Sequence, residues 1–131
     1  MTLVDRKSRF LLATPLSRLG SKEVKTAMIE SLRGEPIHSI TPDRGREFQL
    51  HGKVTATLGV EFYFPPPYQW RGTNENTNGL LREYFPKGYD FSQLSDKDLQ
   101  KVVDQLNHRP RKCLGYRTPA EVYFSTMLHL A

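Results

Sequence analysis

The sequence predicts an α/β domain in which a mixed β-sheet carries helices packed against it. Two apolar runs, at about 1–4 and 9–16, flank a polar turn at 5–8 and predict a β-hairpin. Strand-like and helix-like segments then alternate, which is typical of a sheet covered by helices. With 131 residues, the chain fits a single domain.

The segments after the hairpin have recognisable ends. Ser21 is a candidate N-cap for a helix that Gly34 terminates, and the helix carries apolar residues at helical spacing. Residues 37–41 are predicted to form a strand. Residues 48–58 predict an amphipathic helical segment, which Gly59 ends.

The second half of the chain is mainly helical. Residues 60–64 predict an aromatic-rich strand, and the three prolines at 65–67 begin a stiff loop. A helix is expected over 73–85. A further helix follows Ser95, and a last short helix has Thr118 as N-cap and proline at its first position.

Composition excludes several classes of protein. The chain has 25% charged residues and no apolar run of the roughly 20 residues that a membrane helix needs. Its N-terminus lacks the basic and apolar regions of a signal peptide, so we expect a cytoplasmic protein. A single cysteine excludes an internal disulfide. The net charge of +5 suits an anionic partner, most commonly nucleic acid.

Two carboxylates lie at positions that are typical of catalytic residues. Asp43 follows the strand at 37–41, and Glu75 lies in the first turn of the helix at 73–85. Carboxylates from different elements can converge on Mg²⁺, which supports in-line displacement at phosphorus. The alternatives are structural, because Asp is also a common helix cap and an acid at a helix start interacts favourably with the helix dipole.

Four blocks of sequence resemble the integrase-core (DDE) transposases of bacterial insertion sequences, in the group numbered thirty. One block is the Asp-x-Gly-x-Glu-Phe motif that starts at Asp43, and the most specific block runs from Asn74 to Gly88. Together the blocks cover nearly the whole chain, in the family's order, at 4–10, 41–48, 71–88 and 106–121.

The resemblance implies a ribonuclease H-like integrase catalytic core that binds two Mg²⁺ (or Mn²⁺) ions and cuts and joins DNA. Asp43 matches the family's second catalytic and metal-binding acid, and Glu75 matches the third. Asn78 and Arg82 match the motif on the helix of the third acid, whose face they share at i+3 and i+7. The implied partners are element-end DNA, target DNA and other transposase subunits, at the bacterial nucleoid.

The family pattern fails at two places. The family's first acid lies on a strand before the hairpin, and this sequence has neither that strand nor that acid; Asp5 matches a hairpin-turn residue instead. We therefore expect residues 1–131 to form a partial core that is inactive alone, with the sheet and site at about 1–90 and C-terminal helices at about 91–131. The loop at 65–70 also departs from the family's usual histidine, serine and Trp-Gln order.

Polar and basic residues gather around the Glu75 helix and after the next helix. As a group they are expected to contact DNA phosphates, although a solvated basic face is the alternative for any one of them. The predicted DNA-binding residues are Arg71, Asn78, Arg82, Lys87, Arg109, Arg111 and Lys112.

Three functions remain open at this point. The chain could be part of a transposase, a non-catalytic remnant that binds DNA or transposase subunits, or a ribonuclease H-like nuclease that uses only Asp43 and Glu75. Strand joining distinguishes the first function, and DNA binding without cleavage distinguishes the second.

Absence of a central strand would expose sheet edges and apolar side chains. We therefore expect the chain alone to be marginally stable or to associate. Thermal unfolding followed by circular dichroism should show a midpoint that rises with protein concentration, or a broad transition at low temperature. A sharp, concentration-independent transition of a monomer would contradict this expectation.

Overall fold

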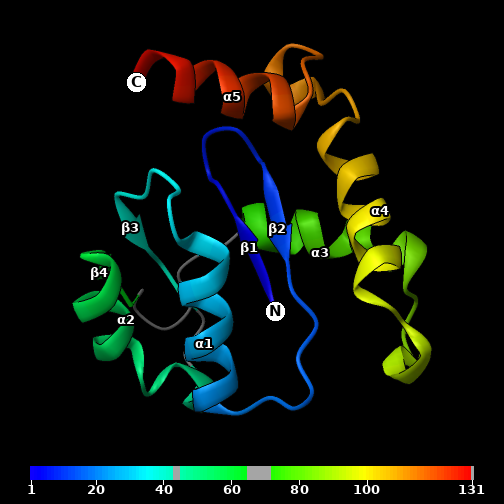
Figure 1. Ribbon diagram of the computed structural model, residues 1–131. Coiled ribbons are helices and arrows are strands. Elements are labelled where there is room, and N and C mark those ends of the chain that lie inside the picture. Colours follow the sequence, from blue (N-terminus) through cyan, green and yellow to red (C-terminus); the bar gives the residue numbers. More distant parts are fainter. Residues whose placement is uncertain (43–44, 65–71, 131) are drawn as a thin grey trace. The chain divides into compact units, whose positions relative to one another are not determined.

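The computed structural model describes residues 1–42, 45–64 and 72–130, with the backbone alone for 72–75 and 126–130 (Figure 1). The chain divides into two compact units. Met1 and Thr14–Trp70 form the first, and Thr2–Ala13 and Arg71–Ala131 form the second. The elements follow the predicted order β-β-α-β-α-β-α-α-α, and within the described residues three short 3-10 helices lie between them.

The first unit packs two helices together beside a small parallel sheet. Helix α1 (Ser21–Leu32) contacts α2 (His51–Leu58) and the 3-10 helix η1 (Arg46–Phe48). Strand β3 (Ser39–Ile40) pairs in parallel with β4 (Glu61–Phe62). The buried apolar side chains of this unit are those of Val24, Ala27, Met28, Leu32, Ile40, Val54 and Val60.

Four elements of this unit have bounds that differ from the predicted ones. Gly20, and not Ser21, is the N-cap of α1, because the Val24 amide already donates to the Gly20 carbonyl at 3.0 Å. The strands at 37–41 and 60–64 shorten to two residues each. The expected helical segment at 48–58 begins as η1 and continues as α2. Gly59 ends it as predicted, with a left-handed φ of 68°.

A β-hairpin begins the second unit. Strand β1 (Thr2–Val4) pairs antiparallel with β2 (Leu11–Ala13). The described strands thus form two separate two-stranded sheets, one antiparallel (β1–β2) and one parallel (β3–β4). Asp5 has the predicted turn role, because its carboxylate accepts hydrogen bonds from the Ser8 amide (2.8 Å) and the Ser8 hydroxyl. Arg9 closes the turn in the left-handed region, at φ 64°.

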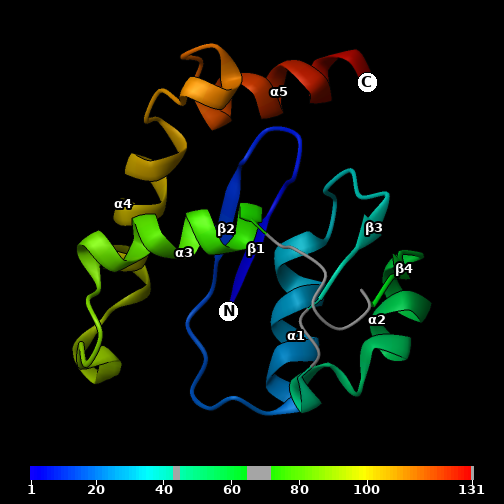
Figure 2. The ribbon, with the colours of Figure 1, turned by 180° about the vertical axis from the view of Figure 1, so that it is seen from behind.

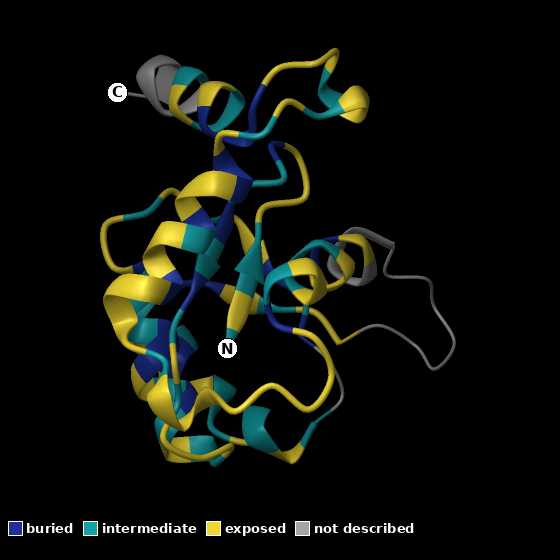
Figure 3. Cartoon of the chain, turned by 90° about the vertical axis from the view of Figure 1, so that its right-hand side faces the viewer, coloured by how far each residue is buried: buried dark blue, intermediate teal, exposed yellow. Residues whose placement is uncertain are grey.

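Helix α4 (Asp96–Asn107) completes the outer edge of β2. The Asn107 side chain accepts from the Leu11 amide at 2.8 Å and donates to the Leu11 carbonyl at 2.9 Å, so it pairs with β2 as a neighbouring strand would. Gln100 donates to the Ala13 carbonyl at 3.0 Å. Buried and exposed residues alternate along α4, as in an amphipathic helix (Figure 3).

Helix α3 (Gly72–Tyr84) runs across the hairpin and contacts β1 (Figure 2). Leu80, Leu81 and Tyr84 pack against the core of this unit, whose buried residues are Leu11, Ala13, Phe85, Leu99, Val103 and Leu106. Full burial of one leucine such as Leu106 contributes about 1.5–3 kcal/mol to the stability of the fold.

The two predicted helix caps in this unit are confirmed. The Ser95 hydroxyl accepts from the Asp98 amide at 3.1 Å at the start of α4. The Thr118 hydroxyl accepts from the Glu121 amide at 3.1 Å, so α5 (Pro119–Leu130) begins at the proline. Each such cap contributes about 1 kcal/mol.

Replacing Asn107 by alanine should destabilise the chain by about 2–5 kcal/mol, because a buried amide and a buried carbonyl of Leu11 lose their partners together. Urea unfolding followed by circular dichroism measures the change. The exposed Gln105 on the same helix supplies the control, and Gln105→Ala should change the free energy of unfolding by less than about 0.5 kcal/mol. Equal costs for the two substitutions would show that the Asn107 hydrogen bonds do not hold the unit together.

Candidate functional site

A strand leads toward Asp43, as predicted, although it is shorter than expected. Strand β3 ends at the buried Ile40, and Pro42 is also buried. Asp43 itself lies outside the described residues. The described chain resumes at Gly45, whose extended backbone begins η1. Asp43 therefore follows the carboxyl end of a strand, the position at which open α/β sheets place functional side chains.

Glu75 lies in the first turn of α3, and its side chain is outside the described residues. Asn78 and Arg82 are exposed, whereas Thr77 is buried at 3% exposure. The face of α3 that carries Glu75, Asn78 and Arg82 by helical spacing is thus not the face that packs on the core. This arrangement leaves Asn78 and Arg82 accessible to a ligand.

The predicted basic residues differ in their surroundings. Lys87 and Lys112 are exposed, and Arg71 lies outside the described residues. Arg109 is already paired: its Nη1 lies 3.2 Å from Glu83 Oε2, and its Nη2 donates to the Tyr84 hydroxyl at 3.1 Å. The Glu83 carboxylate raises the pKa of Arg109. Exposed pairs of this kind contribute about 0–1 kcal/mol.

Arg111 is partly buried, and it is hydrogen-bonded to the backbone of neighbouring segments. Its Nη2 donates to the Leu106 carbonyl at 3.1 Å, and its amide donates to the Arg117 carbonyl at 3.0 Å. Its Nε is buried, and among the described residues this atom has no hydrogen-bond partner. Burial lowers the pKa of Arg111, and the positive charges of Arg109 and Arg9 lower it further.

Arg9 is a basic residue that the sequence prediction left out. It belongs to the hairpin turn, and its charge acts on Arg111, which is 102 positions away in the sequence. Two signals pointed to this turn: it lies in the first of the four resembling blocks, and it carries three cations, Arg6, Lys7 and Arg9. Neither signal shows which distant residue the turn approaches.

The predicted metal ligands are suited to a hard divalent cation, because carboxylate oxygens are the donors that Mg²⁺ and Mn²⁺ prefer. Within residues 1–42, 45–64 and 72–130, no group of three His, Cys, Asp or Glu side chains could hold a metal ion. Asp43 belongs to the first unit and Glu75 to the second, so their convergence on a metal stays a prediction. None of the described helices is both long and apolar enough to cross a bilayer.

The chain is similar to proteins of known type in both sequence and structure. No protein-family model matches it. It is 46% identical over 126 residues to the transposase InsI of insertion sequence element IS30A from Escherichia coli (strain K12), which covers 92% of this chain and 33% of that protein. It is 52% identical over 89 residues to the transposase of element IS4351 from Bacteroides fragilis, covering 66% of this chain and 27% of that protein.

The same fold occurs in a viral integrase. The chain matches the catalytic core domain of BIV integrase with a TM-score of 0.78 at 18% identity, covering 98% of this chain and 86% of that domain. The chain spans about a third of the length of the curated transposases that it matches. With 46% identity over 92% of its length, the chain belongs to the IS30 family of insertion-sequence transposases, and its fold is that of an integrase catalytic core.

Proposed function

We propose that the chain contributes to the catalytic core of a transposase, which cuts DNA at element ends and joins it to target DNA by metal-dependent phosphoryl transfer. The observation that carries this proposal is the 46% identity to a transposase over 92% of the chain. The integrase-core fold and a relative described as a putative integrase, 28% identical over 97% of this chain, support it.

Asp43 and Glu75 are the proposed catalytic and metal-binding residues. Together they would hold two Mg²⁺ or Mn²⁺ ions, which would supply Lewis-acid chemistry for displacement at phosphorus. The proposed basic residues would hold the DNA substrate. Phosphoryl transfer needs little else from a protein than positioning and charge, which explains why no nucleophilic Ser or Cys is required.

The proposed DNA contacts lie on the outer face of α3 and after α4. Asn78 and Arg82 are exposed beside Glu75 on α3, and Lys87 and Lys112 are exposed in the connections. Arg71, Arg109 and Arg111 complete the proposed set. We place residues 1–131 in one catalytic core, with the sheet and site at about 1–90 and helices at about 91–131, which acts with other subunits at the bacterial nucleoid.

Where residues 1–131 act within a complete catalytic core, replacing Asp43 by asparagine should lower metal-dependent cleavage or joining of duplex DNA by more than about 100-fold. Mutating a residue that only supports a metal ligand already costs about 10–100-fold, and losing a ligand itself should cost more. Gel analysis of labelled duplexes with Mg²⁺ or Mn²⁺ measures both products. Asp104→Asn, an exposed acid on α4, removes the same charge and should leave activity unchanged.

The products of that assay also separate the candidate functions. Joining of strands supports a transposase. Cleavage without joining, abolished by Asp43→Asn, would indicate a nuclease of the ribonuclease H type. Sequence-independent binding with neither product at any metal concentration would indicate a non-catalytic DNA-binding remnant.

DNA binding should depend strongly on salt. With about four phosphate contacts, the affinity for a random-sequence duplex should fall by about 10²-fold between about 50 and 200 mM salt. Fluorescence anisotropy measures this, and Arg82→Gln should reduce the slope of log affinity against log salt by about 1. The exposed Lys101 on α4 is the charge-matched control, since Lys101→Gln should keep the slope. Affinity that does not change with salt would exclude phosphate contacts.

A further inference from the structure

The turn of the β1–β2 hairpin presents two cations to the solvent. Arg6 and Lys7 follow Asp5 in the turn, and both side chains are exposed. The next residue, Ser8, is buried at 1% exposure. Within the described part of the chain, neither Arg6 nor Lys7 forms an ion pair or a side-chain hydrogen bond. The turn therefore carries positive charge that is free to meet a ligand.

Other cations of the second unit lie beside carboxylates. Arg109 is 3.2 Å from the carboxylate of Glu83, and Arg117 is 3.9 Å from that of Glu121. The carboxylate of the turn itself, that of Asp5, instead accepts hydrogen bonds from the amide and the hydroxyl of Ser8. Asp5 thus serves to close the turn and leaves its two neighbours, Arg6 and Lys7, without a carboxylate in contact among the described residues.

Hydrogen bonds at the base of the turn fix its backbone. The amide of Arg9 donates to the carbonyl of Asp5 at 2.8 Å, and the amide of Asp5 donates to the carbonyl of Phe10 at 2.9 Å. The amide of Phe10 also donates to the hydroxyl of Ser8, at 3.2 Å. A ligand that binds the tip therefore has to order only two side chains and no backbone, which lowers the entropic cost of binding.

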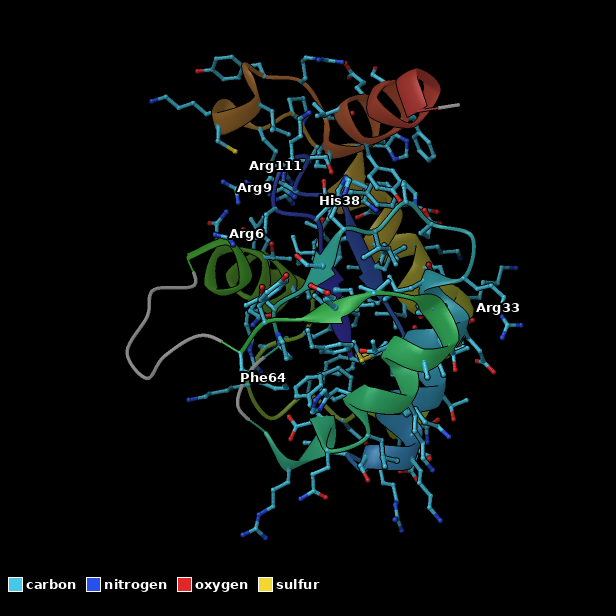
Figure 4. All side chains as sticks on the ribbon, turned by 90° about the vertical axis from the view of Figure 1, so that its left-hand side faces the viewer. Arg6, Arg9, Arg33, His38, Phe64 and Arg111 are labelled. Atoms are coloured by element: carbon cyan, nitrogen blue, oxygen red, sulfur yellow. The ribbon has the colours of Figure 1, made fainter. Side chains whose placement is uncertain are left out.

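The hairpin turn begins next to the helix that carries the proposed DNA-binding face. Strand β1 contacts α3, and Val4 at the end of β1 packs against the same core as Leu80 and Leu81 of α3. Figure 4 shows the labelled side chain of Arg6, shortly after Val4, close to α3 in the view. DNA that lies along the exposed face of α3 would thus pass the cations of the turn.

Two adjacent cations suit a polyanion better than a small anion, because a polyanion offers a separate charge to each of them. Duplex DNA carries one negative charge for about every 1.7 Å of its axis. The guanidinium of arginine and the ammonium of lysine are both common ligands of phosphate.

We propose that Arg6 and Lys7 bind the phosphate backbone of double-stranded DNA, so that the hairpin turn extends the DNA-binding surface beyond α3 and the loop after α4. This inference rests on the proposed function. The contact is independent of base sequence, because it involves phosphates alone.

The salt dependence of DNA binding by the full chain tests this contact. Arg6→Gln and Lys7→Gln should each lower the slope of log affinity against log salt by about 0.9, and the double variant should lower it by about 1.8. Arg6→Lys keeps the charge and should keep the slope. Fluorescence anisotropy with a random-sequence duplex between about 50 and 200 mM salt measures these slopes.

Two matched controls remove the same charges elsewhere. Arg33 is exposed after α1 in the first unit, and Lys101 is exposed on α4 in the second. Arg33→Gln and Lys101→Gln should leave the slope unchanged. The thermal midpoint shows whether each variant is folded. It should stay unchanged for the turn variants, because the side chains that they alter are exposed.

The possible results are distinct. If the unmodified chain does not bind DNA, the proposed function fails together with the inference. If it binds and the turn variants keep its slope, or if the controls lose as much, the inference alone is overturned. Weaker binding of polyglutamate by the turn variants, with unchanged DNA binding, would assign the turn to an acidic protein and also overturn it. Lower slopes in the turn variants, in a chain that neither cuts nor joins DNA, would support the contact and count against catalysis.

Discussion

The side-chain amide of Asn107 forms two hydrogen bonds with the backbone of Leu11, and the second unit is built around this contact. Leu11 and Asn107 are 1% and 3% exposed, so neither partner could exchange the other for water. The contact satisfies both polar groups on the outer edge of β2 at this residue and sets the position of α4 along the strand. Leu99, Val103 and Leu106 then meet the hairpin in the core. A shift of β2 by one residue would remove the hydrogen bonds and reverse the faces of its side chains at the same time.

The same contact connects the fold to the proposed function. Because it joins residues 96 positions apart, it carries the hairpin turn to the loop after α4, and with it the charge of Arg9 to that of Arg111.

The elements that carry the two proposed catalytic acids are held by apolar packing, and within the described residues not by a buried side-chain hydrogen bond. Asp43 follows a strand whose last residue, Ile40, is buried, and Glu75 lies in the first turn of a helix whose other face packs on the hairpin. Each acid thus follows or belongs to an element that hydrophobic burial holds. Functional side chains on helices and strands are positioned more precisely than those on unsupported loops.

The sequence by itself determined the order of the elements, the turn role of Asp5 and the helix ends at Gly59, Ser95 and Thr118, because these features depend on residues only a few positions apart. It also carried the family resemblance that the comparisons confirm. It misplaced the N-cap at Ser21, since Gly20 can take the extended conformation without a side-chain cap. It did not reveal the Asn107 contact or the nearness of Arg9 to Arg111. Those two features come from packing between segments about 100 residues apart, and local preferences carry no information on which distant groups will meet.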